Sequence, residues 1–286
     1  NPRWRPRGRR SVTVAHHQAI VPHRRQEWFC RLFRWYARRL IRKSFNAMRL
    51  ANGGVDAFAN FDAHHGPTML LLNHQSWWDP IFTVALVDRF TPARQVYAPM
   101  DRAMVEQFAF MRKLGLFGVD LDDPAAMKAM VQYASELARD SSNPSFWITP
   151  QGEFADVRAP LELRPGAAAI ASRLGKDGAP TRVLCLAIEL AFWEDRKPEV
   201  LLHAKPCPAP ERSTTSLWQR QMTATMESAM AELAELVIAR DPAGFEPILG
   251  RGTSGVHPVY DAILRLTGRK PQIARHRPHT EPSPRS

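Results

Sequence analysis

Cysteine is scarce in this sequence of 286 residues, with only Cys30, Cys185 and Cys207 and no C-x-x-C pair among them. An odd number of widely spaced cysteines argues against a disulfide framework or a cysteine-rich zinc module, and is typical of reduced thiols in the cytosol. The sequence also lacks any uncharged apolar run of about 18 residues, so it predicts no membrane-spanning helix. Its basic beginning is not followed by the apolar segment that a secretory signal requires.

Acidic residues are almost absent from the first 50 positions, which hold 14 Lys and Arg against the single Glu27. The formal net charge of +11 therefore has an uneven origin, because residues 51–268 carry −6 and residues 269–286 carry +4. A mildly acidic body with basic ends does not by itself indicate a nucleic-acid-binding protein. Because 44% of the residues are hydrophobic, the chain is long and apolar enough for a sizeable folded core.

The pattern of residues divides the chain into four parts. Residues 1–23 are rich in Arg, Pro and His without periodicity, which predicts a disordered basic arm, and residues 269–286 predict a disordered tail. Residues 24–54 predict an amphipathic helix that runs to Leu50 and is stopped by Asn52-Gly53-Gly54. Residues 55–268 predict one domain.

Short apolar runs alternate with amphipathic stretches in that domain. Strands are predicted at residues 68–73, 95–98, 116–119, 145–149, 183–188 and 200–203. Helices are predicted from Asp79-Pro80 and Asp123-Pro124, and over residues 101–114, 167–174, 215–239 and 258–266. The alternation predicts an α/β fold with a mixed, largely parallel sheet flanked by helices and preceded by the basic amphipathic helix. Sites in such folds lie beyond the carboxyl ends of strands, so the loops after residues 72 and 148 are the candidate site.

The first of these loops reads Asn73-His74-Gln75-Ser76-Trp77-Trp78-Asp79-Pro80. A turn after the strand can bring the Asp79 carboxylate back to the imidazole of His74. A carboxylate on one ring nitrogen fixes the tautomer and leaves the other nitrogen free to accept a proton, which predicts a general base. The alternative is a structural pair, in which His74 is a satisfied core histidine and Asp79 an ordinary helix N-cap, because the H-x4-D spacing is common by chance.

Together with the second loop, this block resembles the glycerolipid acyltransferase family, which includes the 1-acylglycerol-3-phosphate and lysophospholipid acyltransferases. Four segments carry the resemblance in the family's order: residues 73–79, 115–120, 149–153 and 163–171. Residues 183–188 stand at the family's last block, although they lack its proline. The resemblance covers roughly residues 66–205.

The resemblance implies transfer of a fatty acyl group from a thioester donor, acyl-CoA or acyl carrier protein, to a lipid hydroxyl in phospholipid or glycolipid synthesis. It implies that His74 is the general base and Asp79 its orienting partner, with no cofactor and no metal. Backbone N–H groups around Gly152 are candidates for stabilising the oxyanion. The resemblance and the neighbouring arginines place substrate binding at Asn73, Gly115, Phe117, Gln151, Gly152, Glu153, Arg158 and Arg164.

Two positions depart from the family pattern, because Leu121 and Phe154 stand where the family usually has arginines. Arginine suits a phosphate because its planar fork binds two oxygens at once. The sequence therefore leaves two classes of lipid acceptor. One is a glycerol phosphate bound by Arg158 and Arg164 instead. The other is a lipid without a phosphate there, such as a glycolipid, an amino-lipid or a glycosylated terpenoid.

The helix predicted over residues 24–50 fits three roles. Apolar side chains opposite arginines favour a helix on an anionic membrane surface, which would place the protein at the cytoplasmic face of a membrane. The residues of that surface would be Trp28, Phe29, Arg31, Leu32, Arg34, Tyr36 and Arg38. A structural helix packed on the domain is the second role. Nucleic-acid binding is the third, but no reader motif supports it and no nucleic-acid partner is predicted.

The sequence is also compatible with two other functions. The histidines His64 and His65, together with His74 and Asp79, suggest a metal-dependent hydrolase, although their spacing matches no known ligand pattern. A non-enzymatic protein that binds an anionic surface or nucleic acid would need neither His74 nor Asp79.

Overall fold

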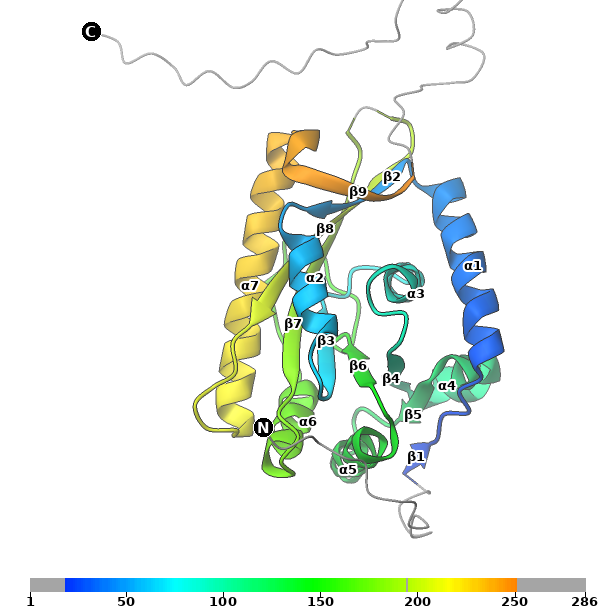
Figure 1. Ribbon diagram of the computed structural model, residues 1–286, viewed down its shortest axis with the longest axis vertical. Helices are drawn as coiled ribbons and strands as arrows, with labels where there is room; N and C mark the ends of the chain where they lie inside the picture. The colour runs from blue at the N-terminus through cyan, green and yellow to red at the C-terminus, as the bar shows by residue number, and fades with distance from the viewer. Residues whose placement is uncertain (1–18, 194, 251–286) are drawn as a thin grey trace, which may run out of the picture.

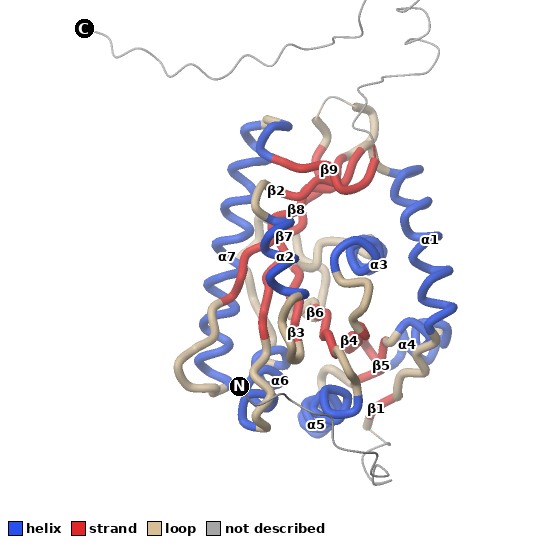
Figure 2. Tube along the Cα trace, in the orientation of Figure 1, coloured by secondary structure: helices blue, strands red, loops and turns tan. Residues whose placement is uncertain are grey.

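The computed structural model describes residues 19–193 and 195–250. Most of the predicted arm, the predicted helix at residues 258–266 and the predicted tail lie outside the described residues. The described part of the chain forms one sheet with helices on both faces, and Figure 1 shows α7 on one side of it and α1 on the other. Figure 2 shows the same arrangement with the strands in red between the blue helices.

The sheet is mixed, and most of its strand pairs are parallel. Its strands are β1 (Ile20–Val21), β2 (Ala47–Ala51), β3 (Thr68–Leu72), β4 (Gln95–Asp101), β5 (Leu116–Val119), β6 (Pro144–Ile148), β7 (Arg182–Ala191), β8 (Glu199–Cys207) and β9 (Phe245–Gly250). Their order is β1-β5-β4-β6-β3-β7-β8-β2-β9. β3, β4, β5, β6 and β7 pair in parallel, as do β2 and β8, whereas β1–β5, β7–β8 and β2–β9 are antiparallel. The predicted mixed, largely parallel sheet is confirmed.

Helices bury both faces of the central strands. The helices are α1 (Glu27–Ser44), α2 (Gly54–Asp62), α3 (Asp79–Phe90), α4 (Arg102–Gln107), α5 (Pro124–Asp140), α6 (Gly166–Lys176) and α7 (Thr215–Ala239), with the 3-10 turns η2 (Ala109–Leu114) and η3 (Pro242–Gly244). In β3, Met69 and Leu71 belong to the core under α5, α6 and α7, whereas Leu70 and Leu72 belong to the core under α1, α2 and α3. This burial on both faces is why residues 68–72 form a continuous apolar run.

The first predicted helix is shorter in the structure than in the prediction. It begins at Glu27 and ends at Ser44, because residues 47–51 form β2 and pair in parallel with β8. Gly53, in the left-handed region at φ 81°, precedes α2 and does not terminate α1. A short apolar run fits both the helical and the strand period, so its pairing partner decides. The helix predicted over residues 101–114 is divided into α4 and η2.

Among the described helices, none is both long enough and apolar enough to cross a membrane.

Candidate active site

His74 and Asp79 stand together beyond the carboxyl end of β3. Nδ1 of His74 lies 2.8 Å from Oδ2 of Asp79. The Asp79 side chain is completely buried at the start of α3, while the His74 side chain is 17% exposed. Among the described residues, no group hydrogen-bonds to the other ring nitrogen, Nε2. The pair therefore leaves one basic nitrogen available to a substrate, as the general-base prediction requires.

The loop before α3 fixes the carboxylate of Asp79. Its Oδ2 accepts the backbone N–H groups of Gln75 and Ser76, each at 3.0 Å, and its Oδ1 accepts the Ser76 hydroxyl at 3.3 Å. These donors precede the helix, and no side chain caps the N–H groups of its first turn. The predicted N-cap role of Asp79 is therefore wrong, because the carboxylate turns back to the loop that carries His74.

The loop after β6 closes against the first loop through the backbone of His74. Oε1 of the buried Gln151 accepts the His74 N–H at 2.6 Å. The N–H of Ala155 donates to the His74 carbonyl at 2.8 Å. The two loops selected from the sequence therefore form one site, and Gln151 holds the backbone of the histidine.

Gly152 makes the turn of the second loop. Its φ of 76° lies in the left-handed region, and a Cβ there would stand 2.8 Å from Nε of Arg164. Its N–H already donates to the Thr149 carbonyl at 3.2 Å, so this predicted oxyanion donor is occupied. Among the described residues, the N–H groups of Glu153 and Phe154 have no acceptor, which leaves them as the candidate oxyanion donors of this loop.

Phe154 lies against the imidazole of His74. The ring centroids are 4.4 Å apart, the planes are tilted by 50°, and the Phe154 side chain is 60% exposed. The position where the resembled family usually has an arginine thus places an uncharged aromatic ring beside the imidazole of His74. The sequence showed that Phe154 replaces the usual arginine. It could not show that Phe154 contacts His74, because this contact depends on how the second loop folds.

Three predicted substrate-binding residues serve the fold. Asn73 uses both halves of its amide on Ile188 of β7, donating to the carbonyl at 3.0 Å and accepting the N–H at 2.7 Å. Phe117 is fully buried in the core. Gly115 has φ 103°, and a Cβ there would stand 2.3 Å from the Val96 carbonyl oxygen. In the structure, these positions therefore shape the surroundings of the site.

Arg158 and Glu153 are exposed, and Arg158 pairs with Asp156 at 2.7 Å. The hydrogen bonds from Arg158 hold the pKa of Asp156 well below its usual range and raise the pKa of Arg158. Glu189 lies on β7 within the field of this pair, and its burial raises its pKa. No pattern in the sequence pointed to Glu189, because only the pairing of β7 with β3 brings it to the carboxyl end of β3.

Arg164, the other arginine predicted to bind substrate, pairs with Asp122 at 3.2 Å.

His64 and His65 do not join this site. They precede β3, whereas His74 follows it, and the five residues of that strand span about 16 Å. His64 Nε2 is hydrogen-bonded to the Pro180 carbonyl at 3.0 Å. Among the described residues, no three His, Cys, Asp or Glu side chains are grouped so that they could hold a metal ion. The shared metal cluster considered from the sequence is therefore wrong on geometry.

Helix α1 exposes an apolar stripe and buries one of its predicted surface arginines. Trp28 and Trp35 are 61% and 55% exposed. Leu32, Tyr36 and Arg31 are also exposed, whereas Phe29 packs against Phe110 with ring centroids 6.4 Å apart.

The opposite face of α1 packs against α3. Arg34 is buried and pairs with Glu27 at 2.7 Å and with Asp88 at 3.8 Å. Arg38 is half-buried and also pairs with Asp88. The helix thus combines the predicted structural role, on one face, with an exposed apolar stripe on the other. The placement of Arg34 on the membrane surface is wrong.

Comparison with known proteins gives two matches. Residues 56–188, which include both loops of the site, match the model of a family described as Acyltransferase, and this match confirms the predicted family. The structure is similar to the crystal structure of the 1-acyl-sn-glycerophosphate (LPA) acyltransferase, PlsC, from Thermotoga maritima. The sequence identity is 14% and the TM-score 0.49, over 72% of this chain and 79% of that chain. Comparison with curated proteins gives no significant match.

Proposed function

We propose that this chain, whose residues 56–188 match the acyltransferase family model, transfers a fatty acyl group from a thioester donor to the hydroxyl of a lipid acceptor. The observation that carries the proposal is the His74–Asp79 pair, with its carboxylate buried and its Nε2 unoccupied by protein groups. Acyl-CoA and acyl carrier protein are the two donor classes, and the product belongs to phospholipid or glycolipid synthesis.

In the proposed reaction, Nε2 of His74 takes the proton of the acceptor hydroxyl while the oxygen attacks the thioester carbonyl carbon. Asp79 holds Nδ1, which keeps Nε2 as the accepting nitrogen and stabilises the imidazolium. The N–H groups of Glu153 and Phe154 are the proposed oxyanion donors. The intermediate then expels the thiolate, which receives the proton from the imidazolium. A positioned base contributes about 10²–10⁴-fold in rate, and the sequence of steps needs no cofactor, metal or acyl-enzyme.

The proposed acceptor presents an uncharged group to His74. Phe154 supports this choice, because a ring that borders the base offers no charge to a phosphate. Two arginines of this loop could bind a phosphate in place of the missing family arginines, but both are already paired. Arg158 pairs with Asp156, and Arg164 pairs with Asp122. A glycolipid-type acceptor is therefore proposed first. A glycerol phosphate is the second candidate, favoured by the position of Arg164 against the Gly152 turn.

The proposed location is the anionic, cytoplasmic face of a membrane. The exposed stripe of Trp28, Leu32 and Trp35 on α1 supports it, because large apolar side chains beside arginines are typical of interfacial helices.

The test is turnover by His74→Ala with labelled lyso- and glycolipid acceptors and either acyl-CoA or acyl carrier protein as donor. We expect a loss of about 10²–10⁴-fold with an unchanged melting temperature. His65→Ala is the matched control, because His65 is exposed and precedes β3, at the opposite end of that strand from His74. We expect this variant to keep full activity. Undiminished turnover by His74→Ala would refute the role of His74 as the base. No turnover by the parent with any acceptor and either donor would favour a non-enzymatic surface-binding protein.

A further inference from the structure

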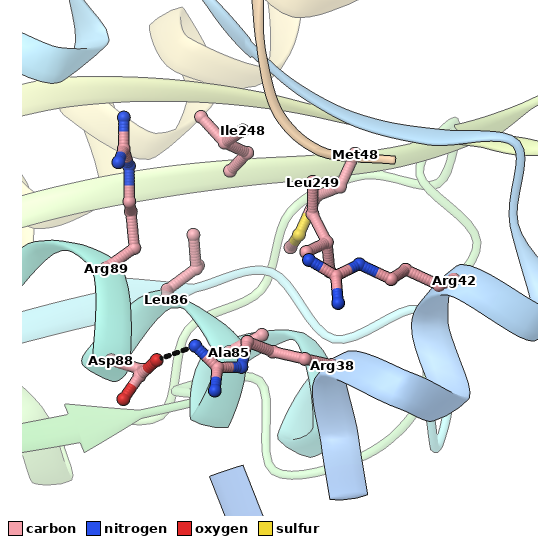
Figure 3. A pocket seen from close by; sticks show the side chains of 9 residues that line it. All are labelled: Arg38, Arg42, Met48, Ala85, Leu86, Asp88, Arg89, Ile248 and Leu249. Atoms are coloured by element: carbon pink, nitrogen blue, oxygen red, sulfur yellow. Dashed lines mark hydrogen bonds and ion pairs between the residues drawn. The ribbon is translucent and has the colours of Figure 1, made fainter. Parts of the chain in front are cut away.

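A second concave site lies between α1, α3, β2 and β9 (Figure 3). Its volume is about 320 Å³, at the lower end of the range of ligand pockets. The nearest catalytic residue on α3 is Asp79, ten residues of helix before Arg89, which corresponds to about 15 Å. The pocket is therefore separate from the His74–Asp79 pair.

Arginines from two helices surround an apolar floor in this pocket. Arg38 and Arg42 come from α1 and Arg89 comes from the last turn of α3, while Met48, Leu86 and Leu249 provide apolar surface. Figure 3 shows the Arg42 and Arg89 side chains on opposite sides, with the apolar side chains between them.

The charges of this pocket do not cancel. Arg38 pairs with Asp88, the acidic residue of the lining. Arg42 and Arg89 are exposed, and no carboxylate pairs with either of them among the described residues. Two cationic groups at the rim are thus left without a carboxylate partner among the described residues, and the Arg89 guanidinium lies 5.9 Å from the centroid of the Phe90 ring.

The position of each arginine in its helix has an ordinary explanation, but their placement around one pocket does not. The last turn of a helix favours a basic side chain, and both Arg42 and Arg89 occupy such a turn. That preference does not require a cavity that keeps Met48 and Leu86 between the two guanidinium groups. Apolar surface combined with two guanidinium groups that no carboxylate pairs suits a ligand that is anionic at one end and apolar at the other.

We propose that this pocket binds the headgroup of one anionic phospholipid, with its phosphate between Arg42 and Arg89 and its glycerol part on the apolar floor. A membrane lipid is proposed over a soluble phosphate because α1, which supplies Arg38 and Arg42, also carries the exposed apolar side chains Trp28, Leu32 and Trp35. The volume admits a headgroup but not full acyl chains, which stay in the membrane beside the exposed stripe of α1. The inference rests on the proposed membrane location, and not on the chemistry of His74.

The experiment titrates the full chain with dihexanoyl phosphatidylglycerol as monomers, below its micelle concentration, and measures the heat of binding. We expect saturable binding of one lipid, weakened at least about tenfold in Arg42→Ala/Arg89→Ala. Arg31→Ala/Arg39→Ala removes the same charge from exposed positions of α1 outside the pocket and is expected to bind within about twofold of the parent. Leu249→Trp fills the cavity without changing the charge and is expected to abolish binding.

Equal weakening in the two double variants would overturn the inference, because it would show diffuse attraction by surface charge. Parent-like binding by Leu249→Trp would overturn it as well. Inorganic phosphate or CoA that displaces the lipid at equal concentration would identify a soluble ligand and reject the lipid. Acyl transfer to a soluble acceptor is measured in the same proteins. We expect it to persist in the pocket variants and to be lost in His74→Ala, so the two proposals fail separately.

Discussion

The side-chain carbonyl of Gln151 accepts the backbone N–H of His74 at 2.6 Å, across 77 positions of the sequence. Gln151 is buried, and among the described residues its Nε2 has no protein partner. The resemblance implied that this residue binds the substrate. The geometry adds a positioning role, because the histidine backbone depends on it.

Gln151→Ala therefore removes the acceptor of the His74 N–H. We expect a loss of about 1–3 kcal/mol in the free energy of unfolding and a fall in kcat of about 10- to 100-fold, because the base is displaced. Gln151→Glu keeps an oxygen at this position and is expected to retain most of kcat. Steady-state kinetics and urea unfolding of both variants check this. A rise in KM alone, equal in both variants, would show that Gln151 only binds the acceptor.

Phe154→Arg restores the charge that the resembled family usually carries at this position. A charge-assisted hydrogen bond contributes about 1.5–3 kcal/mol, so the variant should gain at least about tenfold in kcat/KM for lysophosphatidic acid relative to an uncharged acceptor. Phe154→Leu is the control, because it removes the ring without adding charge, and it should keep the preference of the parent. An equal loss on both acceptors in Phe154→Arg would mean that the position does not contact the acceptor headgroup.

The proposed catalytic pair was predictable because it is local. His74 and Asp79 lie five positions apart in one loop, so the end of a strand and the start of a helix were enough to bring them together. Helix α7 was predicted over the residues that it occupies, 215–239, because a pattern of 25 residues distinguishes the helical period clearly.

Contacts between distant segments could not be read in the same way. Asn73 looked like a substrate-binding residue, but its partner Ile188 lies 115 positions away and is brought near only by the pairing of β3 with β7. Residues 47–51 continued a helical pattern because five apolar-rich residues fit either period, and the pairing with β8 decides their conformation. Arg34 likewise lies buried where α1 packs against α3, with Asp88 of that helix 3.8 Å from its Nε and Glu27 of its own helix at 2.7 Å.

The raised pKa of Glu189 predicts that its contribution to the stability of the folded protein decreases as the pH rises. Burial raises its pKa, so the folded protein binds this proton more tightly than the unfolded chain does. The contribution to the free energy of unfolding is present at low pH and falls as the pH rises through the pKa of the folded state. Glu189→Gln carries a neutral side chain throughout. We expect it to be more stable than the parent at pH 7, with the difference shrinking toward pH 4 in urea unfolding.

Glu235→Gln, at an exposed position of α7, is the control and should show no such trend. A difference for Glu189→Gln that stays constant from pH 4 to pH 7 would contradict the role of its ionisation.

Trp28→Ala/Trp35→Ala tests whether the exposed apolar stripe of α1 binds a membrane. Burying a large apolar side chain stabilises association by about 1.5–3 kcal/mol, so the double variant should bind anionic vesicles at least about tenfold more weakly. Phe192→Ala/Ile238→Ala is the matched control, because it removes two exposed apolar side chains, 65% and 78% accessible, from other elements. Equal vesicle binding by the two double variants in a flotation assay would reject the stripe as the membrane face.

Asn73→Asp separates a structural from a substrate-binding role for the first residue of the loop. At pH 7 the carboxylate would face the Ile188 carbonyl, which now receives a hydrogen bond from the Asn73 amide, and the buried repulsion should destabilise the fold by about 2–4 kcal/mol. Protonation at low pH restores a donor, so the loss should shrink as the pH falls, which urea unfolding at pH 4 and pH 7 measures. Asn73→Ala has no proton to gain and should be destabilised equally at both. Were Asn73 instead bound to the acceptor, Asn73→Asp would raise KM and leave the free energy of unfolding unchanged at either pH.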